Sequence, residues 1–251
     1  MAIALFDCDG ILVNTEEITT RNARQCLQAL GLTYSDDDFQ ERFDGADFAT
    51  FRQCASDDYF QRSGQPLPEK FFEDMQASYL VLEAAEIKPI AGVQDLLESL
   101  ERSQVPMAVC SNSFAVNIER KLKMVGLFNF FAGRIIGRDH VVNGKPAPDV
   151  YLAGMARLGG TDPQKSIAFE DSTTGVKAAR AAHMHVMGYT GGNAVPAHQA
   201  QRLVSAGADF TAASMAAIAM EAFERIDMID QGPGWRNAPQ RAKRLGHSGP
   251  V

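Results

Sequence analysis

Short apolar runs that end abruptly in polar residues are the clearest pattern along the chain. Between these runs, apolar residues recur three or four positions apart, which is the spacing of an amphipathic helix. Strands and helices that alternate in this way build a parallel sheet with helices on both faces. The pattern predicts an α/β fold, a doubly wound parallel sheet of Rossmann-like type, with strands at Ile3 to Phe6, Val105 to Cys110, Arg134 to Ile136, Ser166 to Phe169 and Val186 to Tyr189.

Residues 14–87 interrupt this alternation, because they offer apolar helical faces but no convincing strand. We interpret this segment as an inserted, all-helical domain, so that residues 1–13 and 88–225 form one discontinuous α/β core. After about Arg225 the periodicity ends, and the remaining sequence contains many Gly, Pro and basic residues. Residues 226–251 are therefore expected to form a flexible tail.

The composition limits the classes of function. The chain has 251 residues, 45% of them hydrophobic and 22% charged, with a net charge of -7, which is ordinary for a soluble protein and disfavours nucleic acid as a partner. Asp7 and Asp9 interrupt the apolar start long before it could form a signal peptide or a membrane span. The four cysteines form no CxxC pair, which fits a reducing compartment. We expect a cytoplasmic protein that binds neither nucleic acid nor a membrane.

Two acidic pairs follow apolar runs directly. Asp7 and Asp9 come after the first predicted strand, and Glu170 and Asp171 end the run that begins at Ser166. Because ligands bind at the carboxyl ends of parallel strands, both pairs should meet in one crevice. Clustered carboxylates need a compensating charge, and a hard divalent cation such as Mg²⁺ supplies it. The sequence therefore predicts a magnesium site formed by all four acids.

Four further residues predict a phosphate site beside that metal. Gly10 permits a tight reversal that brings backbone amides toward a ligand. Ser111 and Asn112 follow another predicted strand, where a helix begins with free N–H groups that suit an anion. Lys145 lies in a proline-rich segment before a helix, and its ammonium can neutralise a phosphoryl oxygen. We expect these four residues to hold the oxygens of a phosphoryl group.

Together these residues specify a reaction. Asp7 attacks phosphorus to give an aspartyl phosphate, while Asp9 protonates the leaving oxygen and later deprotonates water. Ser111, Asn112 and Lys145 hold the equatorial oxygens, because phosphoryl transfer is catalysed chiefly by positioning and electrostatics. The hypothesis is a magnesium-dependent phosphotransferase that passes the phosphoryl group to water.

The chain resembles the haloacid dehalogenase superfamily in four ordered motifs. These are Phe6 to Glu16 (Phe-Asp-Cys-Asp-Gly-Ile-Leu-Val-Asn-Thr-Glu), Ser111-Asn112, Lys145 to Asp149 (Lys-Pro-Ala-Pro-Asp) and Phe169 to Ser172 (Phe-Glu-Asp-Ser). Within the superfamily it is similar to the beta-phosphoglucomutase-like group, which carries a helical cap between the first two motifs. The resemblance implies the roles given above to the acids, Ser111 and Lys145. It also implies that the backbone carbonyl of Asp9, rather than its side chain, reaches the metal.

Two departures from the group narrow the expected activity. Asn14 stands where the family usually has an aspartate near the metal. Beta-phosphoglucomutases have a histidine shortly after the first motif and an arginine beyond the cap glycine, whereas this chain has Thr19 and the stretch Ala46 to Phe48 there. Without a cap cation to hold a second phosphate, a phosphatase for small sugar, polyol or sugar-acid phosphates is favoured over a mutase.

Three functions therefore remain open at the level of sequence. The leading one is hydrolysis of a small phosphorylated metabolite by a monomer or weak homodimer. The alternatives are a beta-phosphoglucomutase-type phosphomutase and a non-catalytic protein that keeps the fold and binds a partner through the acidic cap. Substrate choice is expected to depend on cap side chains such as Arg42, Asp47 and Arg52.

Overall fold

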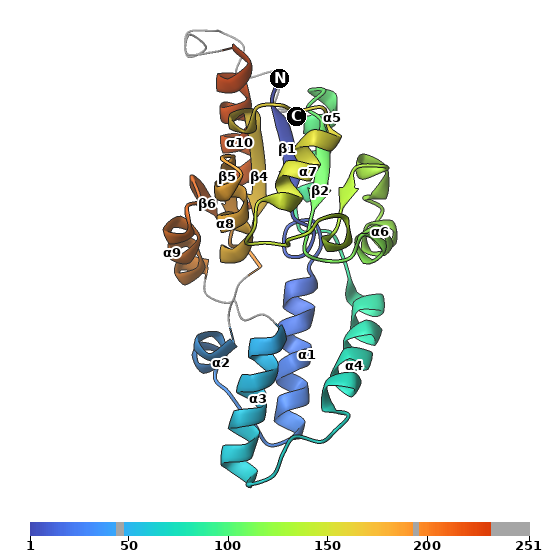
Figure 1. Ribbon diagram of the computed structural model, residues 1–251, viewed down its shortest axis with the longest axis vertical. Coiled ribbons are helices and arrows are strands. Elements are labelled where there is room, and N and C mark those ends of the chain that lie inside the picture. The colour runs from blue at the N-terminus through green and yellow to red at the C-terminus, as the bar shows by residue number, and fades with distance from the viewer. Residues whose placement is uncertain (44–47, 193–195, 232–251) are drawn as a thin grey trace, which may run out of the picture. The chain divides into compact units, whose positions relative to one another are not determined.

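A computed structural model describes residues 1–43, 48–192 and 196–231. The chain forms two compact units, shown in Figure 1. One is the α/β unit, which joins Met1–Val13 to the chain from Pro89 onward, and the other is the helical unit, Asn14–Lys88. The sequence placed this insertion at residues 14–87.

The α/β unit is built on a six-stranded parallel sheet with the order β3-β2-β1-β4-β5-β6. The predicted fold class is confirmed. Strand β1 lies between β2 and β4, so the three strands that precede the chemical motifs are neighbours (Figure 1). The strands are β1 Ile3–Phe6, β2 Met107–Cys110, β3 Ile135–Ile136, β4 Ser166–Glu170, β5 His185–Tyr189 and β6 Phe210–Ala212.

Helices cover the sheet and close its core. Because successive side chains of a strand point to opposite faces, Ile3 and Leu5 pack with helices α7, α8 and α9, whereas Phe6 lies on the other face. There the Phe6 ring stacks on Phe169, with ring centroids 4.4 Å apart. The helices are α5 Val93–Arg102, α6 Ala115–Met124, α7 Asp149–Arg157, α8 Thr173–Ala181, α9 Pro196–Ala206 and α10 Met215–Gln231, with short 3-10 turns at Phe128–Phe131, Arg138–His140 and Pro163–Lys165.

Two features of the C-terminal part differ from the prediction. Helix α10 continues to Gln231, so residues 226–231 are not part of a tail. The helix extends because Ile226 continues its buried face, which includes Ile218 and Phe223. Strand β6 was not predicted, since it has only three partly buried residues at the sheet edge. The rest of the predicted tail lies outside the described residues.

The helical unit has its own apolar core. Its buried side chains come from all four helices and the loop after the first, and they include Leu27, Phe39, Ala55 and Phe71. At the unit's two ends, the Asn14 side-chain oxygen accepts a hydrogen bond from the backbone N–H of Lys88 at 2.8 Å. The asparagine thus ties together the two chain segments that enter and leave the unit. The helices are α1 Thr15–Ala29, α2 Asp36–Phe43, α3 Phe48–Ser63 and α4 Phe71–Glu86.

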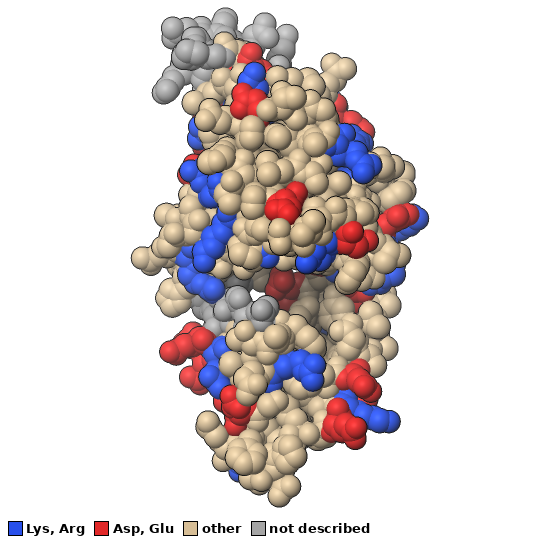
Figure 2. Space-filling view, in the orientation of Figure 1, with Lys and Arg blue, Asp and Glu red and all other residues tan. Residues whose placement is uncertain are grey.

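The surface carries charges of both signs. Figure 2 shows acidic and basic side chains on both units on the face that it presents. Among the described residues, the helices are too short or too polar to traverse a lipid bilayer.

Candidate active site

Three neighbouring strands deliver the predicted site residues to one edge of the sheet. Asp7 follows β1, Ser111 follows β2, and Glu170 ends β4. The backbone N–H of Asp7 donates to the carbonyl of Phe169 at 3.0 Å, which continues the pairing of β1 with β4 past the last assigned residue of β1. The carboxyl ends of these strands therefore place Asp7, Ser111 and Glu170 at the same edge of the sheet, as expected when the strands are parallel.

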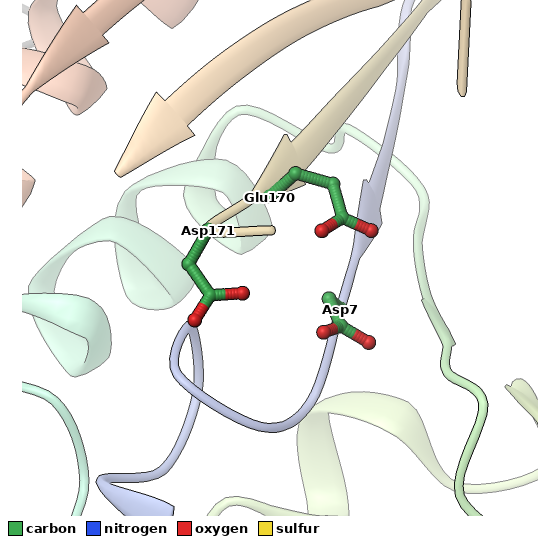
Figure 3. Close-up of side chains that lie close together, drawn as sticks. All are labelled: Asp7, Glu170 and Asp171. Atoms are coloured by element: carbon green, nitrogen blue, oxygen red, sulfur yellow. The ribbon is translucent and has the colours of Figure 1, made fainter. Parts of the chain in front are cut away.

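Three carboxylates converge at this edge. Asp7, Glu170 and Asp171 each offer an oxygen within 4.8 Å of the others, and Figure 3 shows the three side chains close together. Glu170 is fully buried, and the other two are nearly so. An oxygen-only donor set of this density suits a hard divalent cation such as Mg²⁺. The residues present fit the metal that the sequence predicts.

Lys145 supplies the positive charge inside this group. Its Nζ donates to Asp7 Oδ1 at 2.8 Å and to Glu170 Oε1 at 2.6 Å, and its side chain is only 3% exposed. Burial alone would lower the pKa of the ammonium, but the two carboxylates raise it above its ordinary value. Lys145 is therefore a permanent cation beside the carboxylate that is expected to attack phosphorus.

The charge of Asp7 is only partly compensated. Burial raises the pKa of Asp7 to about 6, Lys145 opposes this shift, and the carboxylates of Glu170 and Asp9 add to it. The Lys145 ammonium is shared between Asp7 and Glu170, so it does not offset the charge of both carboxylates. A divalent cation would remove this imbalance and favour the ionised form of Asp7.

The fully buried Glu170 is held by side chains that were not predicted. Tyr151 donates its hydroxyl to Glu170 Oε1 at 2.5 Å, and Ser172 donates to Oε2 at 3.1 Å. Gly175 leaves room for the carboxylate, since a Cβ atom there would lie 1.9 Å from Oε1. Burial and the nearby Glu170 charge raise the pKa of Tyr151 well above its usual value, so the phenol remains a donor. These three residues fix the orientation of one expected metal ligand.

The Asn112 side chain forms hydrogen bonds to the backbone of Lys145. Its side-chain oxygen accepts from the backbone N–H of Lys145 at 2.8 Å, and its Nδ2 donates to the Lys145 carbonyl at 3.1 Å. Ser111 is buried beside it, and its Oγ accepts from the N–H of Ser113 at 3.3 Å. The structure thus gives the Asn112 side chain a role in holding the lysine loop, and its direct contact with phosphate stays a prediction.

Asp9 and Gly10 lie in the loop after β1. The carboxylate of Asp9 is not part of the three-acid group; it accepts hydrogen bonds from Ser113 and Lys121. Metal binding by its backbone carbonyl stays a prediction. Gly10 has φ 77°, which favours glycine. Its N–H donates to the Val13 carbonyl at 2.9 Å, so this amide closes the loop and contacts phosphate only if that bond opens.

The basic side chains expected to select the substrate have partners within the helical unit. Arg42 donates to both carboxylate oxygens of Asp58, at 3.1 and 2.7 Å. The Arg52 guanidinium lies over the rings of Phe48 and Phe72, 5.7 and 4.8 Å from their centroids. Their role in selectivity stays a prediction, and Asp47 lies outside the described residues.

Comparison with known proteins identifies the family. Residues 4–189 match the model of the haloacid dehalogenase-like hydrolases. The chain belongs to this family. The resemblance seen in the four motifs is thereby confirmed at the level of the superfamily, and the chain is a hydrolase by membership.

Several curated relatives of this hydrolase are named phosphatases. A probable pseudouridine-5'-phosphatase of Drosophila melanogaster is 31% identical over 191 residues, which are 73% of this chain and 79% of the relative. The fructose-1-phosphate phosphatase YqaB of Escherichia coli is 30% identical over 72% of this chain and 92% of its own length. The match to Protein SUPPRESSOR OF QUENCHING 1 of Arabidopsis thaliana, at 30% identity, spans only 17% of that protein.

A solved structure shares the architecture of the hydrolase. It is a HAD family hydrolase from Deinococcus radiodurans with bound phosphate and sodium, 27% identical, and the match covers 90% of this chain and 96% of that one with a TM-score of 0.76. Its similarity extends over nearly the whole chain, so it includes the helical insertion as well as the sheet.

Proposed function

We propose that this hydrolase is a magnesium-dependent phosphatase that cleaves a small phosphomonoester, such as a sugar, polyol or sugar-acid phosphate, through an aspartyl phosphate. The observation that carries the proposal is the buried group of Asp7, Glu170 and Asp171, of which Asp7 and Glu170 pair with the Lys145 ammonium. A nucleophilic carboxylate, a set of oxygen ligands and a fixed cation are the parts that phosphoryl transfer requires. The named phosphatases among the relatives support the same class of reaction.

In the first half of the reaction, an oxygen of Asp7 forms a bond to phosphorus and the ester P–O bond breaks. The leaving oxygen keeps the electron pair of that bond and takes a proton from Asp9. Lys145 and the Ser111 hydroxyl hold the equatorial oxygens and stabilise their charge. In the second half, Asp9 takes a proton from water as that water attacks phosphorus, and the Asp7 carboxylate is regenerated with release of phosphate.

Asp7, Glu170, Asp171 and the backbone carbonyl of Asp9 would hold the Mg²⁺ ion. When bound, the ion neutralises charge on the carboxylates and on the phosphate, which lets an anionic nucleophile approach an anionic ester. Tyr151 and Ser172 keep Glu170 oriented toward it. Such supporting hydrogen bonds are a general requirement of metal sites.

Hydrolysis is favoured over mutase activity because two residues of the beta-phosphoglucomutases are replaced in this sequence. Thr19 and the stretch Ala46 to Phe48 stand where beta-phosphoglucomutases carry a histidine and an arginine, so these positions do not supply a cation for a second phosphate. A non-catalytic binding protein is disfavoured because Asp7, Lys145 and Glu170 retain the ion-paired geometry of a reactive centre.

A screen of phosphorylated small molecules tests the proposal. The enzyme is incubated with a panel of sugar, polyol and sugar-acid phosphates, with Mg²⁺ or with a chelator, and both free phosphate and isomerised ester are measured. We expect stoichiometric phosphate release from some members of the panel, and its loss with the chelator. Accumulation of an isomer with little free phosphate would indicate the mutase. No turnover of any member with Mg²⁺ present would contradict catalysis.

Magnesium affinity is expected to depend on pH. Without the ion, burial holds the pKa of Asp7 at about 6, so below this pH the ion must displace a proton from Asp7. The apparent dissociation constant should be about tenfold higher at about pH 5 than at about pH 7. Calorimetric titration in buffers of different ionisation enthalpy measures both the affinity and the protons released. An affinity that stays constant across this range would contradict the assigned role of Asp7.

A further inference from the structure

Helix α6 places a lysine where its pattern calls for an apolar residue. Ile118, Lys121 and Leu122 form its buried face, and Lys121 is only 7% exposed. Positions three and four apart share one face of a helix, so Lys121 points into the same interior as the two aliphatic side chains. Burying an ammonium is costly unless a partner compensates its charge. A charged residue on the apolar face of a helix indicates a position with a specific role.

The partner of Lys121 is the carboxylate of Asp9. Lys121 Nζ donates to Asp9 Oδ1 at 2.5 Å, and Ser113 Oγ donates to Asp9 Oδ2 at 2.8 Å. Ser113 is itself fixed, because its carbonyl accepts the N–H of Arg138 at 3.0 Å and its own N–H donates to Ser111 Oγ. Each oxygen of Asp9 therefore has a donor, and both donors belong to the segment that follows β2 and carries Ser111.

We propose that Lys121 is a positioning residue for proton transfer by Asp9. The inference rests on the proposed function, in which Asp9 gives its proton to the leaving oxygen and later takes one from water. Two donors from outside the loop fix the plane of the Asp9 carboxylate, which rotation about the side-chain bonds of Asp9 would otherwise change. When the proton moves from Asp9 to the leaving oxygen, negative charge remains on Asp9, and the adjacent ammonium stabilises it.

Substrates with different leaving groups separate this role from simple structural support. An alkyl phosphate needs a proton on its leaving oxygen, whereas p-nitrophenyl phosphate releases a stable phenolate without one. For Lys121→Met, kcat/KM with the alkyl phosphate identified by the screen should fall about 100-fold, the order expected for a misplaced catalytic group. We compare kcat/KM because it reports the steps up to departure of the leaving group, and not the later attack of water that both substrates share. With p-nitrophenyl phosphate the fall should be less than about tenfold. Ser113→Ala should show the same selectivity with a smaller loss.

Lys123→Met is the matched control. Lys123 is two positions further along the same helix, is exposed, and pairs with Glu119 at 2.6 Å. This variant removes a lysine and an ion pair from α6 without touching Asp9, and both substrates should be hydrolysed at the wild-type rate. Melting temperatures of all variants report folding independently of catalysis.

The outcomes separate the positioning role from the proposed function. Equal losses of kcat/KM with both substrates in Lys121→Met and Ser113→Ala would make the ion pair structural and overturn the positioning role. Asp9→Asn is measured alongside. If this variant alone loses activity selectively with the alkyl phosphate, the proposed function holds and the role of Lys121 is wrong. If kcat/KM of Asp9→Asn falls equally with both substrates, Asp9 does not protonate the leaving oxygen, and the proposed mechanism fails together with the role of Lys121. Should Lys121→Met not fold, Ser113→Ala decides.

Discussion

The Asp7→Asn variant is expected to lose phosphatase activity almost completely, with kcat lowered on the order of 10⁴-fold or more. The amide keeps the size of the carboxylate but cannot form the bond to phosphorus, so no aspartyl phosphate arises. The loss should be the same for alkyl and aryl phosphates, because both need the nucleophile. Phosphate release under saturating substrate and Mg²⁺ measures it, and mass spectrometry of the acid-quenched protein detects the phosphorylated intermediate only in the wild type.

The stability of Asp7→Asn distinguishes a chemical loss from a folding defect. Burial raises the pKa of Asp7 to about 6, which means that its ionised form is disfavoured in the folded protein. A neutral side chain removes this penalty, so the melting temperature without metal should not fall. Asp95→Asn makes the same chemical change at an exposed position of α5 and should affect neither property. Activity within about tenfold of wild type in Asp7→Asn would refute a nucleophilic role.

The sequence predicted the parts of the site that lie at strand ends. Asp7, Ser111 and Glu170 follow short apolar runs directly, and the rule that parallel strands present their carboxyl ends to one edge was enough to bring them together. No knowledge of strand order was needed. The structure supplies that order, and it makes the strands concerned, β2, β1 and β4, direct neighbours.

The residues that support the site could not be found in the same way. Tyr151 reads as one apolar position of a helix, and only the tertiary structure brings its hydroxyl to Glu170. Lys121 gave a weak signal, a lysine within the apolar periodicity of α6, but its partner lies 112 positions away. Such contacts depend on how helices pack on the sheet, which periodicity within one segment does not specify.

Gly175→Ala, in helix α8, is expected to displace the Glu170 carboxylate and to destabilise the protein. In an exposed helix, this change would stabilise the protein by about 0.5–1 kcal/mol. Here the added Cβ would lie 1.9 Å from Glu170 Oε1 and 2.0 Å from its Cδ, closer than any real contact, and the Glu170 carboxylate is fully buried among its partners. Steric overlap therefore outweighs helix propensity, and the protein should lose about 1–3 kcal/mol of unfolding free energy.

Displacement of the Glu170 carboxylate should also weaken metal binding and catalysis. Glu170 is one of the three carboxylates expected to bind the metal and also pairs with Lys145, so Mg²⁺ affinity and kcat/KM in Gly175→Ala should each fall about 10- to 100-fold. Gly192→Ala is the control, because no described residue lies within 4 Å of a Cβ added there and its φ is not in the left-handed region. Unfolding by urea and Mg²⁺ titration measure the two effects separately. If Gly175→Ala bound Mg²⁺ as tightly as Gly192→Ala does, Glu170 would not be a ligand whose position decides metal binding.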